Sequence, residues 1–368
     1  MTTSTIDIAA CRGRQKRLLD AMQRERLDLA IVTQIEHVQY LAGPRFAWTF
    51  QPAAALTSDG RLTLVAPNRA PEAAAADEVV AYQAQKHSTL RNDQRQASCE
   101  VLAGALAKRK YQRIGVEYST FGQHFAGALG AAHFVDIEPS LYEMRRRKDP
   151  DELALIKKAI AATGRMYAHA REIMRPGITE LEMFNELQSA AVMDLGEMMT
   201  GTGNDYQCAS RGGPPRADRT AQAGQLYILD LGPAFRGYFA DNCRTIAVTE
   251  VDEKQQQAWI QIRRAFDHLE KTVKPGKSCA ELFRETEAIL RESPVGTFDH
   301  HLGHGIGLFP HEAPHLNPNW DDVFQEGEVF TAEPGLYAPE LRVGMRLEND
   351  YLVTKNGVEL LSDFPLEL

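Results

Sequence analysis

The chain has 368 residues, of which 43% are hydrophobic and 25% are charged, and its formal net charge is −9. This length and apolar content predict a globular protein with two domains. The acidic balance argues against a nucleic-acid partner, and no apolar run reaches the roughly 18 residues of a membrane span. Five scattered cysteines without a C-x-x-C motif predict a reducing, cytoplasmic location rather than a disulfide framework.

The first third of the chain alternates helical stretches with short apolar runs. Arg17–Arg26 is typical of an amphipathic helix, and Leu29–Val32 of a buried strand. Gln39–Gly43 is expected to be a strand end and a turn, and Leu62–Val65 and Ile114–Val116 are further strands. Helices and strands that alternate in this way predict an α/β layer.

A new segment begins near residue 149. Asp149 is expected to be a helix N-cap, with Pro150 at the first helical position and Glu152 three residues after the cap. This combination is a strong helix-start signal. We therefore expect an N-terminal α/β domain over residues 1–146 and a second domain over residues 147–368.

The second domain contains an internal repeat. Residues 176–184 align without gaps to residues 275–283, 99 positions later, and a predicted helix precedes each copy, Leu153–Met174 and Lys254–Val273. Each copy is a Pro-Gly turn followed by a capping box that opens an amphipathic helix. The capping pairs are Thr179 with Glu182 and Ser278 with Glu281.

Two aspartates flank the first turn that follows the earlier copy. Asp230 and Asp241 lie on either side of a Gly-Pro-Ala-Phe-Arg-Gly segment between apolar runs. A hairpin centred between Phe235 and Arg236 would make the two aspartates direct cross-strand neighbours. Their Cβ atoms would then lie roughly 5 Å apart, and like charges at that spacing are destabilising.

Two glutamates repeat this arrangement after the later copy. Glu333 and Glu348 are symmetric about Glu340 and Leu341. A buried carboxylate without a partner is very costly, so one cation, or two, held by all four carboxylates would explain both pairs. The alternative is that these residues are exposed acids at strand ends.

A histidine-rich stretch lies between the two pairs. His300, His301, His304 and His311 fall within 299–312, interspersed with glycines that permit close backbone approach. The spacing differs from a zinc helix with ligands one turn apart. One histidine with four carboxylates is an oxygen-rich set that favours Mn²⁺, Co²⁺, Fe²⁺ or Zn²⁺ in a paired site.

These motifs resemble metallopeptidase family M24, whose pita-bread fold is shared by aminopeptidase P, prolidase, methionine aminopeptidase and creatinase. The first domain is similar to the N-terminal domain of the creatinase, prolidase and aminopeptidase P branch. The resemblance implies that Asp230 binds one ion, that His304 and Glu333 bind the other, and that Asp241 and Glu348 bridge both.

The resemblance also implies a reaction, the cleavage of the Xaa-Pro bond of short peptides by a cytoplasmic homodimer. Two divalent ions, with Mn²⁺ preferred and Co²⁺, Zn²⁺ or Fe²⁺ open, would supply a nucleophilic water and stabilise the oxyanion. Glu333 would handle the proton of this water. His300, His311, Tyr337 and Arg346 would surround the substrate, with His300, His311 and Arg346 taking part in catalysis. Arg346 has an alternative role, charge balance for the carboxylates.

One departure from the family pattern changes the substrate side. Xaa-Pro peptidases of this kind carry a histidine shortly before the first aspartate, and residues 210–219 contain none. Arg211 or Arg216 could bind a substrate carboxylate bidentately, or both could be exposed loop residues. A metal-dependent hydrolase or lyase acting on a small non-peptide substrate, such as a cyclic amidine or an osmolyte, is therefore the alternative. A non-catalytic binding module is a third possibility.

Overall fold

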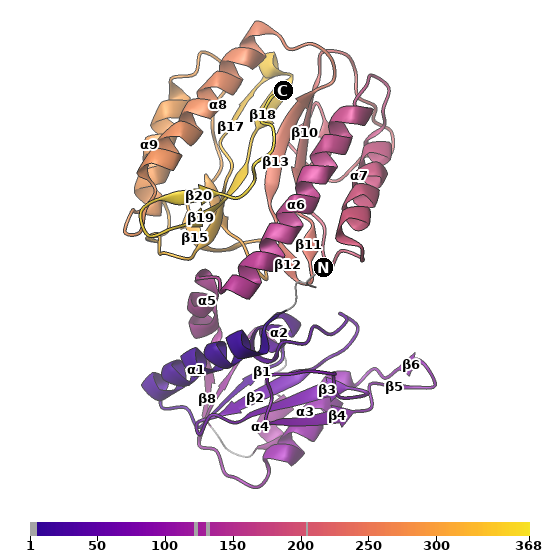
Figure 1. The fold of residues 1–368 in the computed structure, drawn as a ribbon, viewed down its shortest axis with the longest axis vertical. Coiled ribbons are helices and arrows are strands. Elements are labelled where there is room, and N and C mark those ends of the chain that lie inside the picture. Colours follow the sequence, from indigo (N-terminus) through magenta and orange to yellow (C-terminus); the bar gives the residue numbers. More distant parts are fainter. Residues whose placement is uncertain (1–5, 121–123, 130–132, 204) are drawn as a thin grey trace. The chain divides into compact units, whose positions relative to one another are not determined.

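A computed structural model describes residues 6–120, 124–129, 133–203 and 205–368. The chain forms two compact units, Met1–Arg145 and Arg146–Leu368, which we call the N-terminal and C-terminal units. Both mix helices and strands, as Figure 1 shows, and the predicted α/β class is confirmed. Within the described ranges, no helix is long and apolar enough to cross a membrane.

The N-terminal unit is built on a six-stranded sheet in the order β4-β3-β2-β1-β7-β8. The central strand β1 pairs antiparallel with β2 and parallel with β7, and both β1 and β2 are buried along their whole length. Helix α3 packs on β2, β3 and β4. The elements are α1 (Ile8–Glu25), β1 (Leu29–Val32), α2 (Ile35–Ala42), β2 (Ala53–Thr57), β3 (Leu62–Pro67), β4 (Glu78–Tyr82), β5 (Gln85–Lys86), β6 (Thr89–Leu90), α3 (Gln94–Leu106), β7 (Arg113–Val116), α4 (His124–Ala128), β8 (His133–Asp136) and α5 (Glu138–Arg146).

Sequence patterns located most of these elements, with one error. The three predicted strands are confirmed as β1, β3 and β7, and the predicted helix is the second half of α1. The predicted strand end at Gln39–Gly43 is wrong, because this segment is the last part of α2. Val38, Leu41 and Ala42 follow the three- and four-residue spacing of a buried helix face, and Gly43 ends the helix at a positive φ of 100°.

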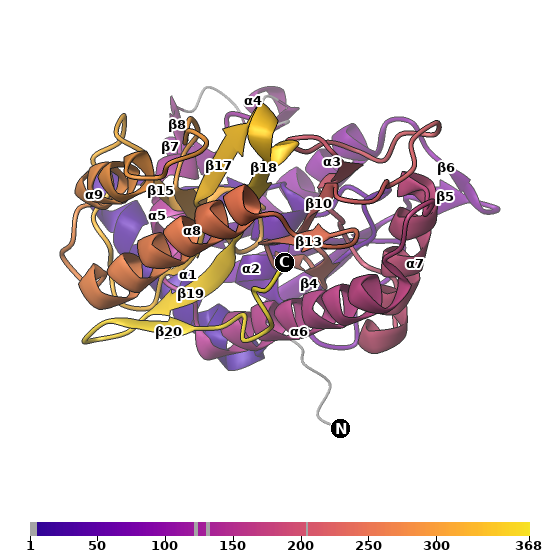
Figure 2. The same ribbon diagram turned by 90° about the horizontal axis from the view of Figure 1, so that it is seen from above.

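The C-terminal unit places four long helices around short antiparallel sheets (Figure 2). Helices α6 and α7 pack together, as do α8 and α9. One sheet has the order β13-β10-β9 and a second has the order β15-β14-β16-β19-β20, while β11-β12 and β17-β18 form separate hairpins. The elements are α6 (Pro150–Ile173), α7 (Glu180–Leu195), β9 (Asp205–Cys208), β10 (Leu226–Leu231), β11 (Ala234–Phe235), β12 (Tyr238–Phe239), β13 (Asn242–Ala247), α8 (Glu253–Thr272), α9 (Cys279–Arg291), β14 (Gly303–Gly305), β15 (Glu312–Leu316), β16 (Val329–Ala332), β17 (Gly335–Ala338), η1 (Pro339–Leu341), β18 (Val343–Arg346), β19 (Asn349–Val353) and β20 (Val358–Leu360).

The internal repeat extends to side-chain contacts. The Thr179 and Ser278 hydroxyls cap α7 and α9, accepting from the backbone N–H groups three residues on. His169 of α6 contacts Glu186 of α7 at 3.0 Å. The same contact recurs 99 residues later, where His268 of α8 contacts Glu285 of α9 at 3.0 Å. The two helix pairs are therefore packed in the same register.

The two hairpins differ in how well the sequence located them. In the second, Gly335 pairs with Arg346, the register predicted for Glu333 and Glu348. In the first, Asp230 pairs with Cys243, so the centre lies one residue later than predicted and Asp241 is a diagonal neighbour of Asp230. Arg236 and Gly237 both have positive φ values, 49° and 92°, and form the tip of the turn.

Candidate metal centre

Hydrogen bonds between the two halves of the repeat bring the acidic residues together. The Glu348 N–H donates to the Cys243 carbonyl at 2.9 Å. Two residues along each strand, the Arg346 N–H donates to the Thr245 hydroxyl at 3.0 Å, and this hydroxyl donates to the Arg346 carbonyl at 2.9 Å. The end of β18 and the segment that leads to Glu348 are thus fixed against β13, which begins immediately after Asp241.

The five predicted ligands converge at this junction. Asp230, Asp241 and Glu348 each offer an oxygen atom, and these atoms lie within 4.8 Å of one another. His304, Glu333 and Glu348 form a second group under the same limit. Glu348 belongs to both groups, so the two triads are contiguous. All five residues are buried, with exposed fractions from 1% to 8%.

The donor set fits divalent cations. Asp230 Oδ1 and Glu348 Oε2 are buried and find no hydrogen-bond partner among the described residues. The His304 Nδ1 atom lies 3.0 Å from the Gly305 carbonyl, which can only accept, so this nitrogen carries the proton. Its Nε2 lone pair therefore faces Asp241 Oδ2 at 3.7 Å and Glu333 Oε1 at 3.9 Å. A histidine held in this tautomer is typical of a metal ligand.

The backbone around His304 needs glycine. A Cβ atom at Gly303 would lie 1.9 Å from the Thr331 carbonyl oxygen, and one at Gly305 would lie 2.1 Å from the Ala313 carbonyl oxygen. The strand β14 can therefore pair between β15 and β16 only with glycine on both sides of His304. This agrees with the close backbone approach expected from the sequence.

Electrostatics also indicate a missing counter-charge. Burial raises the pKa of Asp230 to about 6, and the charges of Asp205 and Glu333 add to this rise. Burial and the neighbouring carboxylates also raise the pKa of Asp241 and that of Glu348 well above their usual values. Carboxylates with raised pKa values in a buried cluster are a recognised mark of a functional site.

Glu333 differs from the other carboxylates. Burial opposes its ionisation, but the hydrogen bond from His301 and the positive charge of Arg346 lower the pKa of Glu333 to about 2. His301 Nε2 lies 3.1 Å from Glu333 Oε1, and no role for this histidine was predicted from the sequence. Its position directly after His300 was the sequence feature from which a role at the site could have been predicted. The His311 ring stacks on the His304 ring with centroids 3.7 Å apart.

A chain of hydrogen bonds links three predicted substrate residues. His300 Nε2 lies 3.0 Å from the Tyr337 hydroxyl. Arg346 NH1 donates to the same hydroxyl at 3.3 Å. The His300 Nδ1 atom lies 2.7 Å from the His301 carbonyl and carries the proton, so Nε2 accepts from the hydroxyl. Arg346, Tyr337 and His300 thus form one directional relay beside Glu333.

The two loop arginines have different surroundings. Arg216 donates to the buried Glu180 carboxylate through Nε at 3.0 Å and Nη2 at 2.5 Å, so it holds the loop to α7. Arg211 stacks over the Tyr337 ring at 3.9 Å from its centroid and makes a two-fold ion pair with Asp299. Of the two, Arg211 lies beside the predicted substrate residues.

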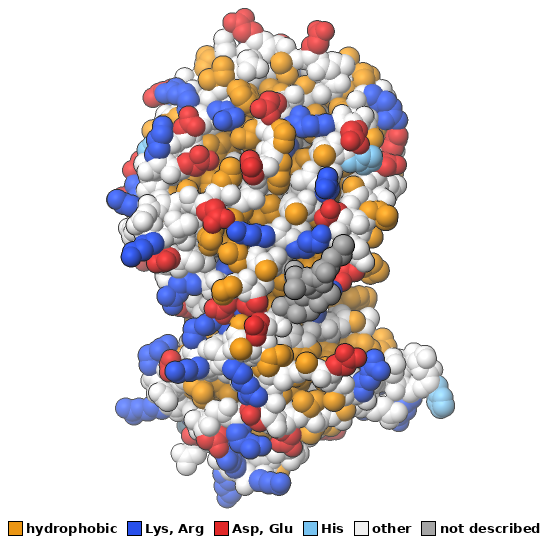
Figure 3. Space-filling view, in the orientation of Figure 1, with side chains coloured by type: hydrophobic (Ala, Val, Ile, Leu, Met, Phe, Trp, Pro, Cys, Tyr) orange, Lys and Arg blue, Asp and Glu red, His pale blue; other side chains and the backbone are white. Residues whose placement is uncertain are grey.

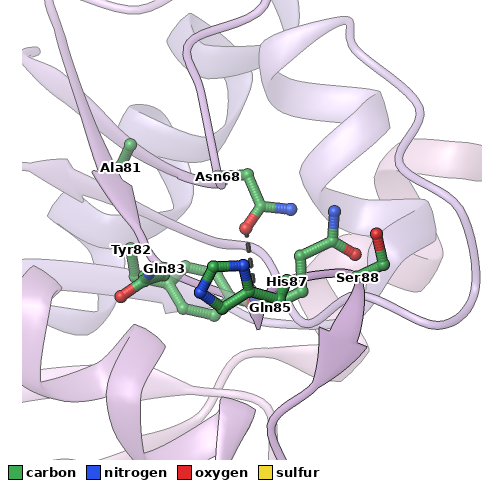
Figure 4. A pocket seen from close by; sticks show the side chains of 7 residues that line it. All are labelled: Asn68, Ala81, Tyr82, Gln83, Gln85, His87 and Ser88. Atoms are coloured by element: carbon green, nitrogen blue, oxygen red, sulfur yellow. Dashed lines mark hydrogen bonds between the residues drawn. The ribbon is translucent and has the colours of Figure 1, made fainter.

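A hollow in the N-terminal unit is a weaker candidate site. This hollow has a volume of about 530 Å³. Figure 4 shows the side chains that line it, which include Asn68, Tyr82 and His87 but no carboxylate. The Asn68 side-chain oxygen there accepts from the Ala84 and Gln85 backbone N–H groups. On the face shown in Figure 3, acidic and basic side chains are interspersed. The metal centre is therefore the strongest candidate site.

Comparison with known proteins agrees with this geometry. Residues 154–355 match the model of metallopeptidase family M24, and residues 14–147 match the creatinase/prolidase N-terminal domain. A Xaa-Pro dipeptidase from Pyrococcus horikoshii is 30% identical over 262 residues, covering 69% of this chain and 74% of that protein. An uncharacterized peptidase from Bacillus subtilis, YqhT, is 28% identical over 270 residues, covering 70% of this chain and 74% of that protein. The structure of a Xaa-Pro dipeptidase from Bacillus anthracis superposes with a TM-score of 0.81 at 25% identity, covering 97% of this chain and 100% of that one.

The fold and the buried donor set define a metallopeptidase. The chain belongs to metallopeptidase family M24, with a creatinase/prolidase-type domain preceding the catalytic one. Membership implies divalent metal ions.

Proposed function

We propose that the chain is a dinuclear metal-dependent hydrolase that cleaves the Xaa-Pro bond of short peptides. The convergence of the two ligand triads on Glu348, with two buried carboxylate oxygens that have no hydrogen-bond partner among the described residues, carries this proposal. Asp230, Asp241 and Glu348 would hold one ion, and Asp241, His304, Glu333 and Glu348 the other. When bound, such ions lower the pKa of a water molecule and polarise the substrate carbonyl.

The side chains around the centre have separate roles in this proposal. Glu333 accepts the proton of the attacking water at an oxygen atom, while the contact with His301 fixes its orientation. His300 and His311 lie beside Glu333 and His304 and contact the substrate. Tyr337 and Arg346 donate hydrogen bonds that keep His300 in one orientation.

Arg211 is our candidate for recognition of the substrate carboxylate. Its ion pair with Asp299 is about half exposed on both sides, and exposed pairs contribute only about 0–1 kcal/mol. A substrate carboxylate can therefore replace Asp299 at little cost, while stacking on Tyr337 keeps the guanidinium in place. This favours peptides with a free carboxyl end close to the scissile bond.

A substrate panel tests the proposed function. The protein is stripped of metal, reloaded with Mn²⁺, Co²⁺, Zn²⁺ or Fe²⁺, and incubated with Xaa-Pro dipeptides and tripeptides, matched Xaa-Ala peptides, and cyclic amides and amidines. We expect cleavage of the Xaa-Pro peptides, with the highest rate in Mn²⁺. A loaded protein that leaves every Xaa-Pro peptide intact rejects the proposal, and turnover of the cyclic compounds alone favours the small-molecule alternative. Light scattering measures the homodimer that we expect.

A further inference from the structure

The Arg346 guanidinium lies between two carboxylates. Its NH2 atom donates to Asp205 Oδ2 at 2.5 Å and to Asp230 Oδ2 at 2.6 Å. Its NH1 atom donates to the Arg211 carbonyl and the Tyr337 hydroxyl. Its Nε atom lies 3.9 Å from Glu333 Oε2, beyond hydrogen-bond distance. Arg346 thus contacts Asp230 through one oxygen only, and Asp230 Oδ1 stays without a partner in the described part of the chain.

Asp205 is fixed in this position by the backbone. Strand β9 pairs with β10 so that Asp205 lies directly across from Asp230. Asp205 thus has the position of direct cross-strand neighbour that was predicted for Asp241. The Gly213 N–H donates to Asp205 Oδ1 at 2.6 Å. A Cβ atom at Gly212 would lie 2.0 Å from Asp205 Oδ2, and Gly212 and Gly213 have φ values of 145° and 122°. The loop that lacks the expected histidine therefore has glycines where the Asp205 carboxylate needs space.

We propose that Asp205 is a positioning residue that restrains Arg346 to one oxygen of Asp230 and so leaves the other oxygen for the metal ion. A guanidinium prefers to pair with both oxygens of a carboxylate. Arg346 Nε is buried and has no hydrogen-bond partner within the described ranges, so the group has a donor available for such a pairing. Asp205 prevents it, because one NH2 hydrogen is held by each aspartate.

This inference rests on the proposed metal centre and has its own test, the affinity for Mn²⁺. Calorimetric titration of the metal-stripped protein compares the wild type with Asp205→Asn and with Asp218→Asn, an exposed aspartate of the following loop. Partners of metal ligands typically contribute about 10–100-fold to metal affinity. We expect Asp205→Asn to weaken Mn²⁺ binding by about tenfold or more, and Asp218→Asn to leave it unchanged.

A double substitution separates positioning from simple charge. In an Arg346→Met background, positioning predicts that Asp205→Asn has no further effect on Mn²⁺ affinity, because the residue it restrains is gone. If Asp205 instead attracts the ion by its own charge, the loss persists or grows in that background, and the proposal is overturned. Arg346→Met alone should not weaken Mn²⁺ binding, which keeps the test valid if Asp205→Asn folds poorly.

The outcomes also distinguish this inference from the proposed function. If the wild type binds no Mn²⁺, the metal centre is wrong and both fall. If the wild type binds Mn²⁺ and Asp205→Asn binds it equally well, only the positioning role of Asp205 is wrong.

Discussion

The two units each contain a buried cluster of ionisable side chains, and the carboxylates of the two clusters differ in their hydrogen-bond partners. In the N-terminal unit, Glu117 contacts the His37 ring through one oxygen, and its other oxygen accepts from the Thr33 and Gln34 backbone N–H groups at 2.6 and 2.9 Å. Arg145 contacts the other nitrogen of His37. Because a guanidinium only donates, that nitrogen accepts, and His37 donates to Glu117.

The buried carboxylates of the C-terminal unit are only partly hydrogen-bonded. Asp230 Oδ1 and Glu348 Oε2 have no hydrogen-bond partner in the parts of the chain that the structure describes. The pKa values shift in opposite directions as a result. Despite burial, the hydrogen bond to His37 lowers the pKa of Glu117, whereas burial raises the pKa of Asp230 to about 6 and that of Glu348 well above its usual value. We therefore interpret the Glu117 cluster as structural, and we propose that the cluster around Glu348 binds cations.

The largest expected effect is on catalysis. Glu333→Gln removes the group that accepts the proton and weakens one metal triad, so kcat for an Xaa-Pro peptide should fall by about 10²–10⁴-fold. Steady-state kinetics of the Mn²⁺-loaded protein measure this. Glu359→Gln, at an exposed ion pair with Lys157, is the matched control and should keep its rate. A Glu333→Gln protein of unchanged kcat would remove Glu333 from the mechanism.

Substitution in the buried cluster around Glu117 should change the stability of the protein and leave metal binding unchanged. Glu117→Gln removes the buried charge that accepts hydrogen bonds from His37 and from the Thr33 and Gln34 backbone N–H groups, and losing hydrogen bonds to a charged group costs about 1.5–3 kcal/mol. Urea unfolding should show this loss to the same extent in metal-free and in Mn²⁺-loaded protein. A loss that appears only in the loaded protein would contradict the separation of the two clusters.

Substitution in the carboxylate cluster around Glu348 should change the stability of the metal-free protein in the opposite direction. Glu348→Gln replaces a carboxylate near Asp230 and Asp241 with an amide that can donate to them, so the metal-free protein should gain stability on the order of 1 kcal/mol. The rise in Tm on addition of Mn²⁺ should be lost in the same variant. Thermal unfolding with and without Mn²⁺ measures both, and a less stable metal-free variant would show that Glu348 is already compensated within the chain.

The smallest effect is a pH dependence of the Glu117 contribution. The folded-state pKa of this carboxyl lies below its usual 4.5, so the unfolded chain takes up the proton first as the pH falls. The stabilisation is therefore complete above pH 4.5 and is lost as the pH falls through the lowered folded-state pKa. Urea unfolding of wild type and Glu117→Gln should show a constant difference from pH 5 to 8 and a smaller one below. A difference that grows towards acid pH contradicts this.

Sequence patterns predicted the residues of the candidate site better than they predicted the strand pairing around it. The five predicted ligands could be named because the motifs that carry the family resemblance are local, and the second hairpin register was predicted correctly from the symmetric placement of Glu333 and Glu348. The first register was wrong because the turn adopts positive φ at Arg236 and Gly237, one residue later than symmetry suggested. Asp205 was missed because its role depends on β9 pairing with β10, a contact between segments with no shared motif. The charge-balance role considered for Arg346 agrees with its contacts to Asp205 and Asp230.

The central claim is that the buried carboxylates around Glu348 in the C-terminal unit hold divalent cations. Calorimetric titration of metal-stripped wild-type protein with Mn²⁺ tests it most directly, with Asp241→Asn as the comparison. We predict saturable binding of two ions per chain in the wild type, and a loss of at least one of them in Asp241→Asn. A wild-type protein that shows no saturable heat and no rise in Tm with Mn²⁺, Co²⁺, Zn²⁺ or Fe²⁺ would contradict the account.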